Sequence, residues 1–144
     1  MTASNQALWK LSKVDIRSPI AASGWPVARV ELHHVTRGRV TDVASAPGAL
    51  DGAFAAVSEM MGVPARVCGL DVKFAAPEAE APQGGGIAAS VLVHVTIEAD
   101  GETFAGRAHG HDILHACVSA YVDAAGNASA ARGHPSTNRG KVNC

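Results

Sequence analysis

Three histidines and an aspartate lie close together where a strand pattern gives way to a helix pattern; they are His109, His111, Asp112 and His115. Imidazole titrates near neutral pH, so histidines in this setting suit general acid–base catalysis. His111 and His115 are also one helical turn apart and, with His109, could bind zinc, although spacing places no cysteine or carboxylate ligand beside them. The remaining alternative is that they are ordinary histidines of a surface loop. We predict no bound metal and no other cofactor.

Asp112 has a counterpart, Asp51, at the start of a helix pattern in the first half of the chain. Either carboxylate could cap its helix by accepting a hydrogen bond from a backbone N–H, a contribution of about 1 kcal/mol. If both faced one pocket, the pair could instead hold a ligand's ammonium group or a transferable proton. A helix start also favours a bound carboxylate, because its N–H groups carry partial positive charge. An enzyme built here would use His109, His111, Asp112 and Asp51 as its catalytic groups.

The elements that position these residues occur twice along the chain. Alternating apolar residues predict strands, and an apolar period of 3.6 residues predicts helices. The predicted order is strands at 9–16, 27–36 and 39–46, a helix at 50–62, strands at 67–74, 87–97 and 102–109, and a helix at 112–125. A shift of 61 residues places Asp51 on Asp112 and Val30 on Val91. We therefore predict an α+β fold of two pseudo-symmetric βββα units.

The first unit spans residues 9–62 and the second spans residues 66–125. We expect residues 1–8 and the tail 126–144 to be disordered, because the tail is rich in Gly, Ala, Ser and Asn and shows no apolar period. The helices are rich in small residues that bury little area alone, so we expect a partner sheet or another copy of the chain to cover them, and we expect a dimer. The small residues are Gly52, Ala55, Ala56, Ala116, Ala120 and Ala124.

The composition of the chain narrows the class of protein. A net charge of -1 over 144 residues gives no electrostatic basis for binding nucleic acid or an anionic membrane. The first residues lack a basic segment followed by an apolar one, and no apolar stretch is long enough to span a membrane, so we expect neither a signal peptide nor a membrane anchor. Cys68, Cys117 and Cys144 are odd in number and widely spaced, which predicts free thiols in a cytoplasmic protein.

Two motifs give the chain a resemblance to a known family. In the second half, Gly106-Arg107-Ala108 is followed by Asp112-Ile113-Leu114, Ala116-Cys117 and Ala120-Tyr121. In the first half, the matching stretch runs from Ala46 to Phe54. This arrangement resembles the C-terminal regulatory (dimerisation) domain of α-isopropylmalate synthase and citramalate synthase, over roughly residues 9–125.

The resemblance implies a homodimer of βββα pairs that binds an end-product amino acid between the units, near both helix starts, and feeds back on a TIM-barrel catalytic domain. It places the ligand-binding residues at Gly48, Leu50, Asp51, His109, Gly110, His111, Asp112 and Ile113. Because we find no barrel in this sequence, it implies a regulatory module for a small carboxylate or amino acid, acting on a separately encoded synthase.

The chain also departs from the family pattern. Ala46-Pro47-Gly48-Ala49 stands where the family has Gly-Asp-Gly-Pro, and His109 and His111 stand where it has small or apolar residues. These departures favour the alternative hypothesis, a small biosynthetic enzyme repurposed from the regulatory fold. Both hypotheses remain open at the level of the sequence, because sites and not folds perform chemistry.

Overall fold

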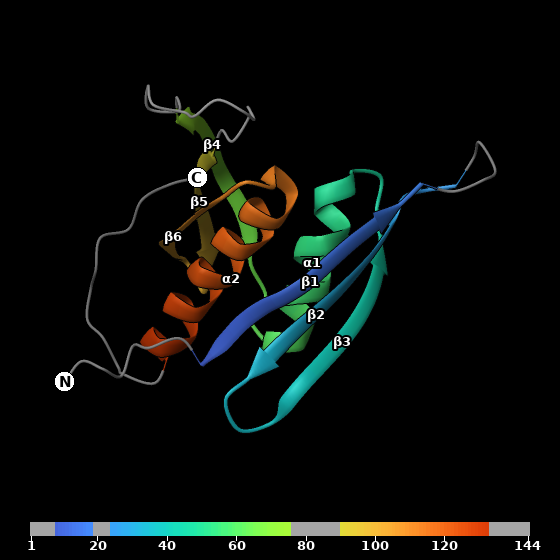
Figure 1. Cartoon of the computed structure of the whole chain (residues 1–144). Coiled ribbons are helices and arrows are strands. Elements are labelled where there is room, and N and C mark those ends of the chain that lie inside the picture. Colours follow the sequence, from blue (N-terminus) through green and yellow to red (C-terminus); the bar gives the residue numbers. More distant parts are fainter. Residues whose placement is uncertain (1–7, 19–23, 76–89, 133–144) are drawn as a thin grey trace.

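The computed structural model describes residues 8–18, 24–75 and 90–132 (Figure 1). The elements are β1 (Trp9–Arg17), β2 (Val27–His34), β3 (Gly38–Ser45), α1 (Ala49–Met61), β4 (Arg66–Ala75), β5 (Ser90–Ala99), β6 (Glu102–Gly110) and α2 (Ile113–Arg132). Strands β1, β2 and β3 form one antiparallel sheet, and β4, β5 and β6 form another. The predicted α+β fold of two βββα units is therefore confirmed.

The turns that close the hairpins follow from the local sequence. Asp100 and Gly101 connect β5 to β6 with φ values of 57° and 79°, the left-handed conformation that a two-residue hairpin loop requires. Gly38 begins β3 with φ of 78°. Gly62 ends α1 with φ of 68°, as predicted from a glycine that follows the last apolar position of the helix. These positions depend on backbone angles that residues with a Cβ adopt only at an energetic cost.

The two helices lie between the two sheets, and the core forms around them (Figure 1). Helix α1 packs on β2 and β3, whereas α2 packs on β5 and β6 and also contacts α1 and β1. The central strands alternate strictly, so that one face of each is buried against the helices. The fully or almost fully buried residues of these strands are Ala28, Val30, Leu32, Val91, Val93, Val95, Ile97 and Ala99.

The small residues of the helices allow each helix to pack closely on the chain's own sheets. A Cβ on Gly106 of β6 would overlap the backbone of Ala120 and Ala124, so the glycine allows α2 to lie directly on the strand. On α1, Gly52 approaches the Ala44 carbonyl in the same way. Of the six small residues that we expected a partner sheet or a second chain to cover, only Ala55 is exposed. The chain's own sheets provide this cover, so the first of the two alternatives is the correct one.

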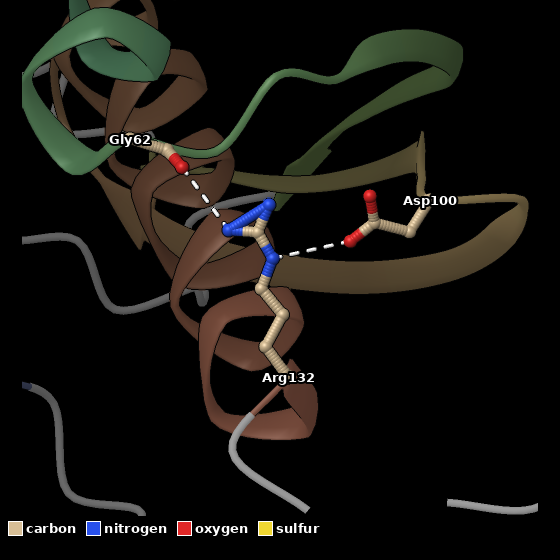
Figure 2. Close-up of polar contacts among 3 residues, drawn as sticks. All are labelled: Gly62, Asp100 and Arg132. Atoms are coloured by element: carbon tan, nitrogen blue, oxygen red, sulfur yellow. Dashed lines mark hydrogen bonds and ion pairs between the residues drawn. The ribbon is translucent and has the colours of Figure 1, made fainter. Parts of the chain in front are cut away.

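Helix α2 continues beyond Ala125, where we predicted its end, to Arg132. The Asn127 side chain donates a hydrogen bond to the Ala105 carbonyl (2.8 Å), and Ala128 is 2% exposed. Arg132 donates from Nε to Asp100 Oδ2 and from Nη1 to the Gly62 carbonyl, both at 3.1 Å (Figure 2). The helix end and the predicted tail boundary at 126 are thus wrong, because contacts distant in sequence hold these turns in place.

The remaining predictions about the termini and the thiols have mixed outcomes. The Leu8 carbonyl accepts a hydrogen bond from Val35 N–H (3.1 Å), so Leu8, which we predicted to be disordered, is held in place. Residues 1–7 and 133–144 lie outside the described part of the chain. Cys117 is a free, buried thiol, but Cys68 is disulfide-bonded, so the predicted free thiol is wrong there. Neither described helix is long and apolar enough to cross a membrane.

Candidate functional site

Both helices begin at the same end of the molecule, the upper end in Figure 1. At the start of α2, Asp112 Oδ1 accepts hydrogen bonds from the backbone N–H of Leu114 (2.9 Å) and His115 (3.2 Å). This is the geometry of an N-cap, in which a carboxylate satisfies N–H groups that have no partner within the helix. The capping role predicted for Asp112 is confirmed.

The start of α1 is built differently. Its N-cap residue is Gly48, which has no side chain to cap with, and Asp51 lies in the first turn. Asp51 Oδ2 lies 2.6 Å from the position that a Cβ of Gly48 would take, so the carboxylate folds back over the helix start. Gly48, and not Asp51, therefore matches Asp112 in the repeat, and the predicted superposition is wrong by three residues at the helices.

Both helix starts already hold a carboxylate of the chain itself. Asp112 accepts hydrogen bonds from two of the backbone N–H groups of α2, and Asp51 occupies the electropositive start of α1. A ligand carboxylate placed there would meet charge of the same sign at either helix. The helix starts are consequently better suited to a positively charged ligand group than to the anion we expected.

The three histidines do not converge on one site. His109 pairs with Leu92, and the neighbouring Val91 and Val93 are buried under α2, so alternation places His109 on the opposite face of the sheet. His111 is exposed after the end of β6, and His115 is half-buried in the first turn of α2. Within the described residues, no group of three or more His, Cys, Asp or Glu side chains could hold a metal ion.

The sequence itself indicates which face of the sheet carries His109. A two-residue turn at Asp100-Gly101 fixes which residues of the two strands face each other, because Ala99 must then pair with Glu102. Counting back from this turn pairs His109 with Leu92, outside the apolar face. The other predicted ligand-binding residues lie at or near the starts of the two helices. Leu50 packs against the core beside the start of α1, Gly110 ends β6, and Ile113 begins α2 with 45% of its side chain exposed.

A groove runs along the side of α1 that faces away from its sheet. It has a volume of about 640 Å³ and continues over the connection from α1 into β4; we call it the α1 groove. Its lining residues are Asp51, Phe54, Ala55, Ser58, Glu59, Gly62, Pro64, Ala65, Arg66, Val67 and Tyr121. Asp51 is the single member of our predicted set that lines it.

The floor of the α1 groove is an aromatic pair. The rings of Phe54 and Tyr121 stack with centroids 4.4 Å apart and an interplanar angle of 11°. The Tyr121 hydroxyl forms a 2.6 Å hydrogen bond with Ser58 Oγ. Burial raises the pKa of Tyr121, while the hydrogen bond with Ser58 acts in the opposite direction. Tyr121 therefore packs the core and lines the groove at once, a combination that depends on α1 meeting α2.

The rim of the α1 groove is charged. Asp51 and Glu59 are exposed on α1, two turns apart. Arg66, the first residue of β4, follows the end of α1 and forms an ion pair with Glu98 through Nη2 and Oε1 (2.7 Å). An apolar floor between carboxylates and a guanidinium can accommodate a small ligand that has an apolar side chain and groups of both charges.

Comparison with known proteins agrees with this architecture. The model of the LeuA allosteric (dimerisation) domain family matches residues 1–129, which include both βββα units. None of the curated proteins compared with the chain matches it. Since the family match covers most of the sequence, the chain is a member of the LeuA allosteric (dimerisation) domain family and has the role of a regulatory module.

Proposed function

We propose that this chain is a homodimeric regulatory module that binds an amino acid or a related small carboxylate in the α1 groove and acts on a separately encoded synthase. The observation that carries the proposal is the groove itself, with an aromatic floor and a rim of both charges. Membership of an allosteric domain family supports the regulatory part of the proposal.

The groove suggests how such a ligand is oriented. An apolar side chain would lie on the Phe54–Tyr121 stack, where its burial contributes about 25 cal/mol per Å². The ammonium group would approach the rim carboxylate of Asp51, beside the aromatic floor. The carboxylates at both helix starts disfavour a bare anion, so an amino acid fits this surface better than the corresponding 2-oxo acid.

The enzymatic alternative finds no comparable support. It requires His109, His111, Asp51 and Asp112 around one pocket. His109 lies on the face of its sheet that α2 leaves open, and Asp112 accepts backbone hydrogen bonds at the start of α2. Regulation is therefore the function that we propose.

Isothermal titration calorimetry tests the recognition directly. We would titrate the chain with L-leucine and other apolar amino acids, and with 4-methyl-2-oxopentanoate, which replaces the ammonium group of leucine with a carbonyl. Replacing Asp51 with Asn should weaken amino-acid binding by about tenfold or more, since a hydrogen bond to a charged group contributes about 1.5–3 kcal/mol. Binding of the 2-oxo acid should be weaker in the wild type and should not fall further in the variant.

The matched control is Asp71→Asn, which removes an exposed carboxylate that forms only a long ion pair with Lys73 (3.9 Å) on β4. This variant should bind as the wild type does. Equal affinity of Asp51→Asn and wild type for every amino acid would show that Asp51 does not contact the ligand. Failure of all the amino acids to bind would contradict the proposed ligand class.

A further inference from the structure

The outer face of the first sheet, which points away from the helices, is basic (Figure 1). On β2, Ala28, Val30 and Leu32 are buried against the helices, so the residues between them lie on the outer face. The ladders place their partners on β1 and β3 on the same face. Its charged residues in the described strands are Lys10, Lys13, Arg17, Arg29 and Arg39, with Asp15 and Glu31. Cations therefore outnumber carboxylates on this face, although the net charge of the chain is -1.

A polar depression lies on this face between β1 and β2. It has a volume of about 470 Å³, and we call it the β1–β2 depression. Its lining residues are Lys13, Val14, Asp15, Arg17, Arg29 and Glu31. The volume lies within the range of about 300–1,000 Å³ that small-molecule sites occupy. Because every lining residue except Val14 is charged, this surface selects a ligand by charge and not by apolar area.

The two carboxylates of the depression are already engaged by cations. Asp15 Oδ2 lies 3.2 Å from Arg17 Nε, and Glu31 Oε2 lies 3.7 Å from Arg39 Nε. These ion pairs are exposed and therefore weak, but they offset the negative charge of both carboxylates. The remaining cations of the depression are consequently the ones available to a ligand.

Those remaining cations are Lys13 and Arg29, and neither forms an ion pair with another described residue. On the ladder, Lys13 pairs with Glu31 and Asp15 pairs with Arg29. Lys13 and Arg29 are therefore diagonal neighbours on one face, a separation of about 7–8 Å that long side chains can bridge. Two anionic groups of one small molecule can contact both of them.

A β-bulge in β1 brings Lys13 to the outer face. Leu11 pairs with Leu32 and is 7% exposed, and regular alternation would place Lys13 on that same buried side. The register shifts between Leu11 and Lys13, so Lys13 pairs with Glu31 on the outer face instead. The bulge thus decides that the two unpaired cations share one face.

The second unit has the bulge without the cations. In β4 the register shifts between Val67 and Gly69, after which Gly69 pairs with Thr96 and Asp71 pairs with His94. Gly69 and His94 thus take the ladder positions that Lys13 and Arg29 have in the first unit. The bulge belongs to the repeated fold, whereas the pair of permanent cations belongs to the first unit alone.

We propose that the β1–β2 depression binds a small dianion, with Arg29 and Lys13 each contacting one of its two anionic groups. A guanidinium donates two parallel hydrogen bonds to a carboxylate or a phosphate, and a lysine ammonium adds a compact positive charge. A dicarboxylate and a phosphorylated metabolite share this chemistry. The depression lies on the face of the first sheet opposite to α1, so it is separate from the α1 groove and from the ligand proposed there.

A chemical-shift titration by NMR of the full, ¹⁵N-labelled chain tests the site. The probes are succinate and inorganic pyrophosphate, which distinguish a dicarboxylate from a phosphorylated ligand, and acetate as a monoanion. The titration is made at low salt, because salt screens exposed charges. At least one dianion should shift the amide resonances of β1 and β2 in a saturable way at millimolar concentration, and acetate should bind more weakly.

Three variants test the roles of the charges in the depression. Lys13→Gln and Arg29→Gln should each weaken binding of the dianion about threefold to fivefold, the upper range for an exposed ion pair. Asp15→Asn removes a carboxylate that repels the anion and releases Arg17, so this variant should bind more tightly than the wild type. A purely structural effect of the substitutions would not produce opposite changes.

The matched control is Arg107→Gln. Arg107 is an exposed arginine that pairs with His94 on the outer face of the second sheet, and its side chain forms no ion pair with another described residue. This variant should bind the dianion as the wild type does. The proposal would be overturned if neither dianion gave saturable shifts, if Arg107→Gln weakened binding as much as Arg29→Gln, or if Asp15→Asn bound less tightly than the wild type. Calorimetry with amino acids reports on the α1 groove and is unaffected by any of these results.

Discussion

The last turns of α2 provide a direct test of how much the tertiary contacts contribute to stability. We compare a chain that ends at Arg132 with one that ends at Ala125. The shorter chain loses the hydrogen bond from Asn127 to the Ala105 carbonyl, the burial of Ala128, and both contacts of Arg132 (Figure 2).

The expected loss follows from these contacts. A typical hydrogen bond contributes about 1 kcal/mol net, which applies to Asn127 and to the bond from Arg132 to the Gly62 carbonyl. The Arg132–Asp100 ion pair is 40% and 60% exposed, so screening by solvent reduces it to about 0–1 kcal/mol. Burial of the Ala128 methyl adds about 0.8 kcal/mol. The backbone hydrogen bonds of these helical turns offset most of the entropy of ordering them, so we expect the shorter chain to be about 2 kcal/mol less stable.

Urea unfolding followed by circular dichroism measures this difference in free energy. In thermal unfolding, a domain of this size should show a fall in Tm of roughly 6–10 °C. Arg132→Ala in the full chain should account for about half of the loss. Equal unfolding free energies for the two truncated chains would refute the reasoning, because they would show that the last turns of α2 do not stabilise the fold.

Two further predictions concern the packing of α2 and the pH dependence of stability. Gly106→Ala should lower the unfolding free energy by about 2 kcal/mol or more, since its Cβ would overlap the backbone of α2. Gly110→Ala on the same strand meets open space and should change the unfolding free energy little; equal losses for the two variants in urea titrations would contradict this prediction. Burial raises the pKa of Cys117 above its ordinary 9.0 and that of Tyr121 above its ordinary 10.0. The contribution of each group to stability is therefore full below its ordinary pKa and falls as the pH rises past 9 for Cys117 and past 10 for Tyr121. Urea unfolding midpoints that do not decrease as the pH is raised from below 9 to above 10 would contradict the sign of this effect.

Much of the fold is encoded locally. Strict alternation through Val91, Val93, Val95 and Ile97 specifies a strand with one buried face, because a strand places successive side chains on opposite sides. Asp100 and Gly101 specify the tight turn through their backbone preferences, and Gly62 specifies the end of α1 in the same way. The order of two βββα units follows from these signals, since each of them acts over a few residues.

The candidate site depended on packing that no local pattern contains. Identical aspartates suggested equivalent roles, but the N-cap of α1 is Gly48 and that of α2 is Asp112, so one carboxylate caps its helix and the other folds back over the start of its helix. The α1 groove exists because Phe54 and Ser58 meet Tyr121, which is 63 residues from Ser58 in the chain.

The length of α2 and the exposure of Leu70 and Phe74 on β4 were likewise decided by tertiary structure. Gly126 and Asn127 are poor helix formers, and the helix continues through them because Asn127 and Arg132 find partners on β6, on the hairpin turn and on α1. The apolar pattern of β4 equals that of a covered strand, yet neither of the two described helices packs along it, and Leu70 and Phe74 are exposed. Sequence therefore determined the elements, whose preferences are local, and tertiary structure decided the site and the exposure on β4, whose energies depend on residues far apart in the chain.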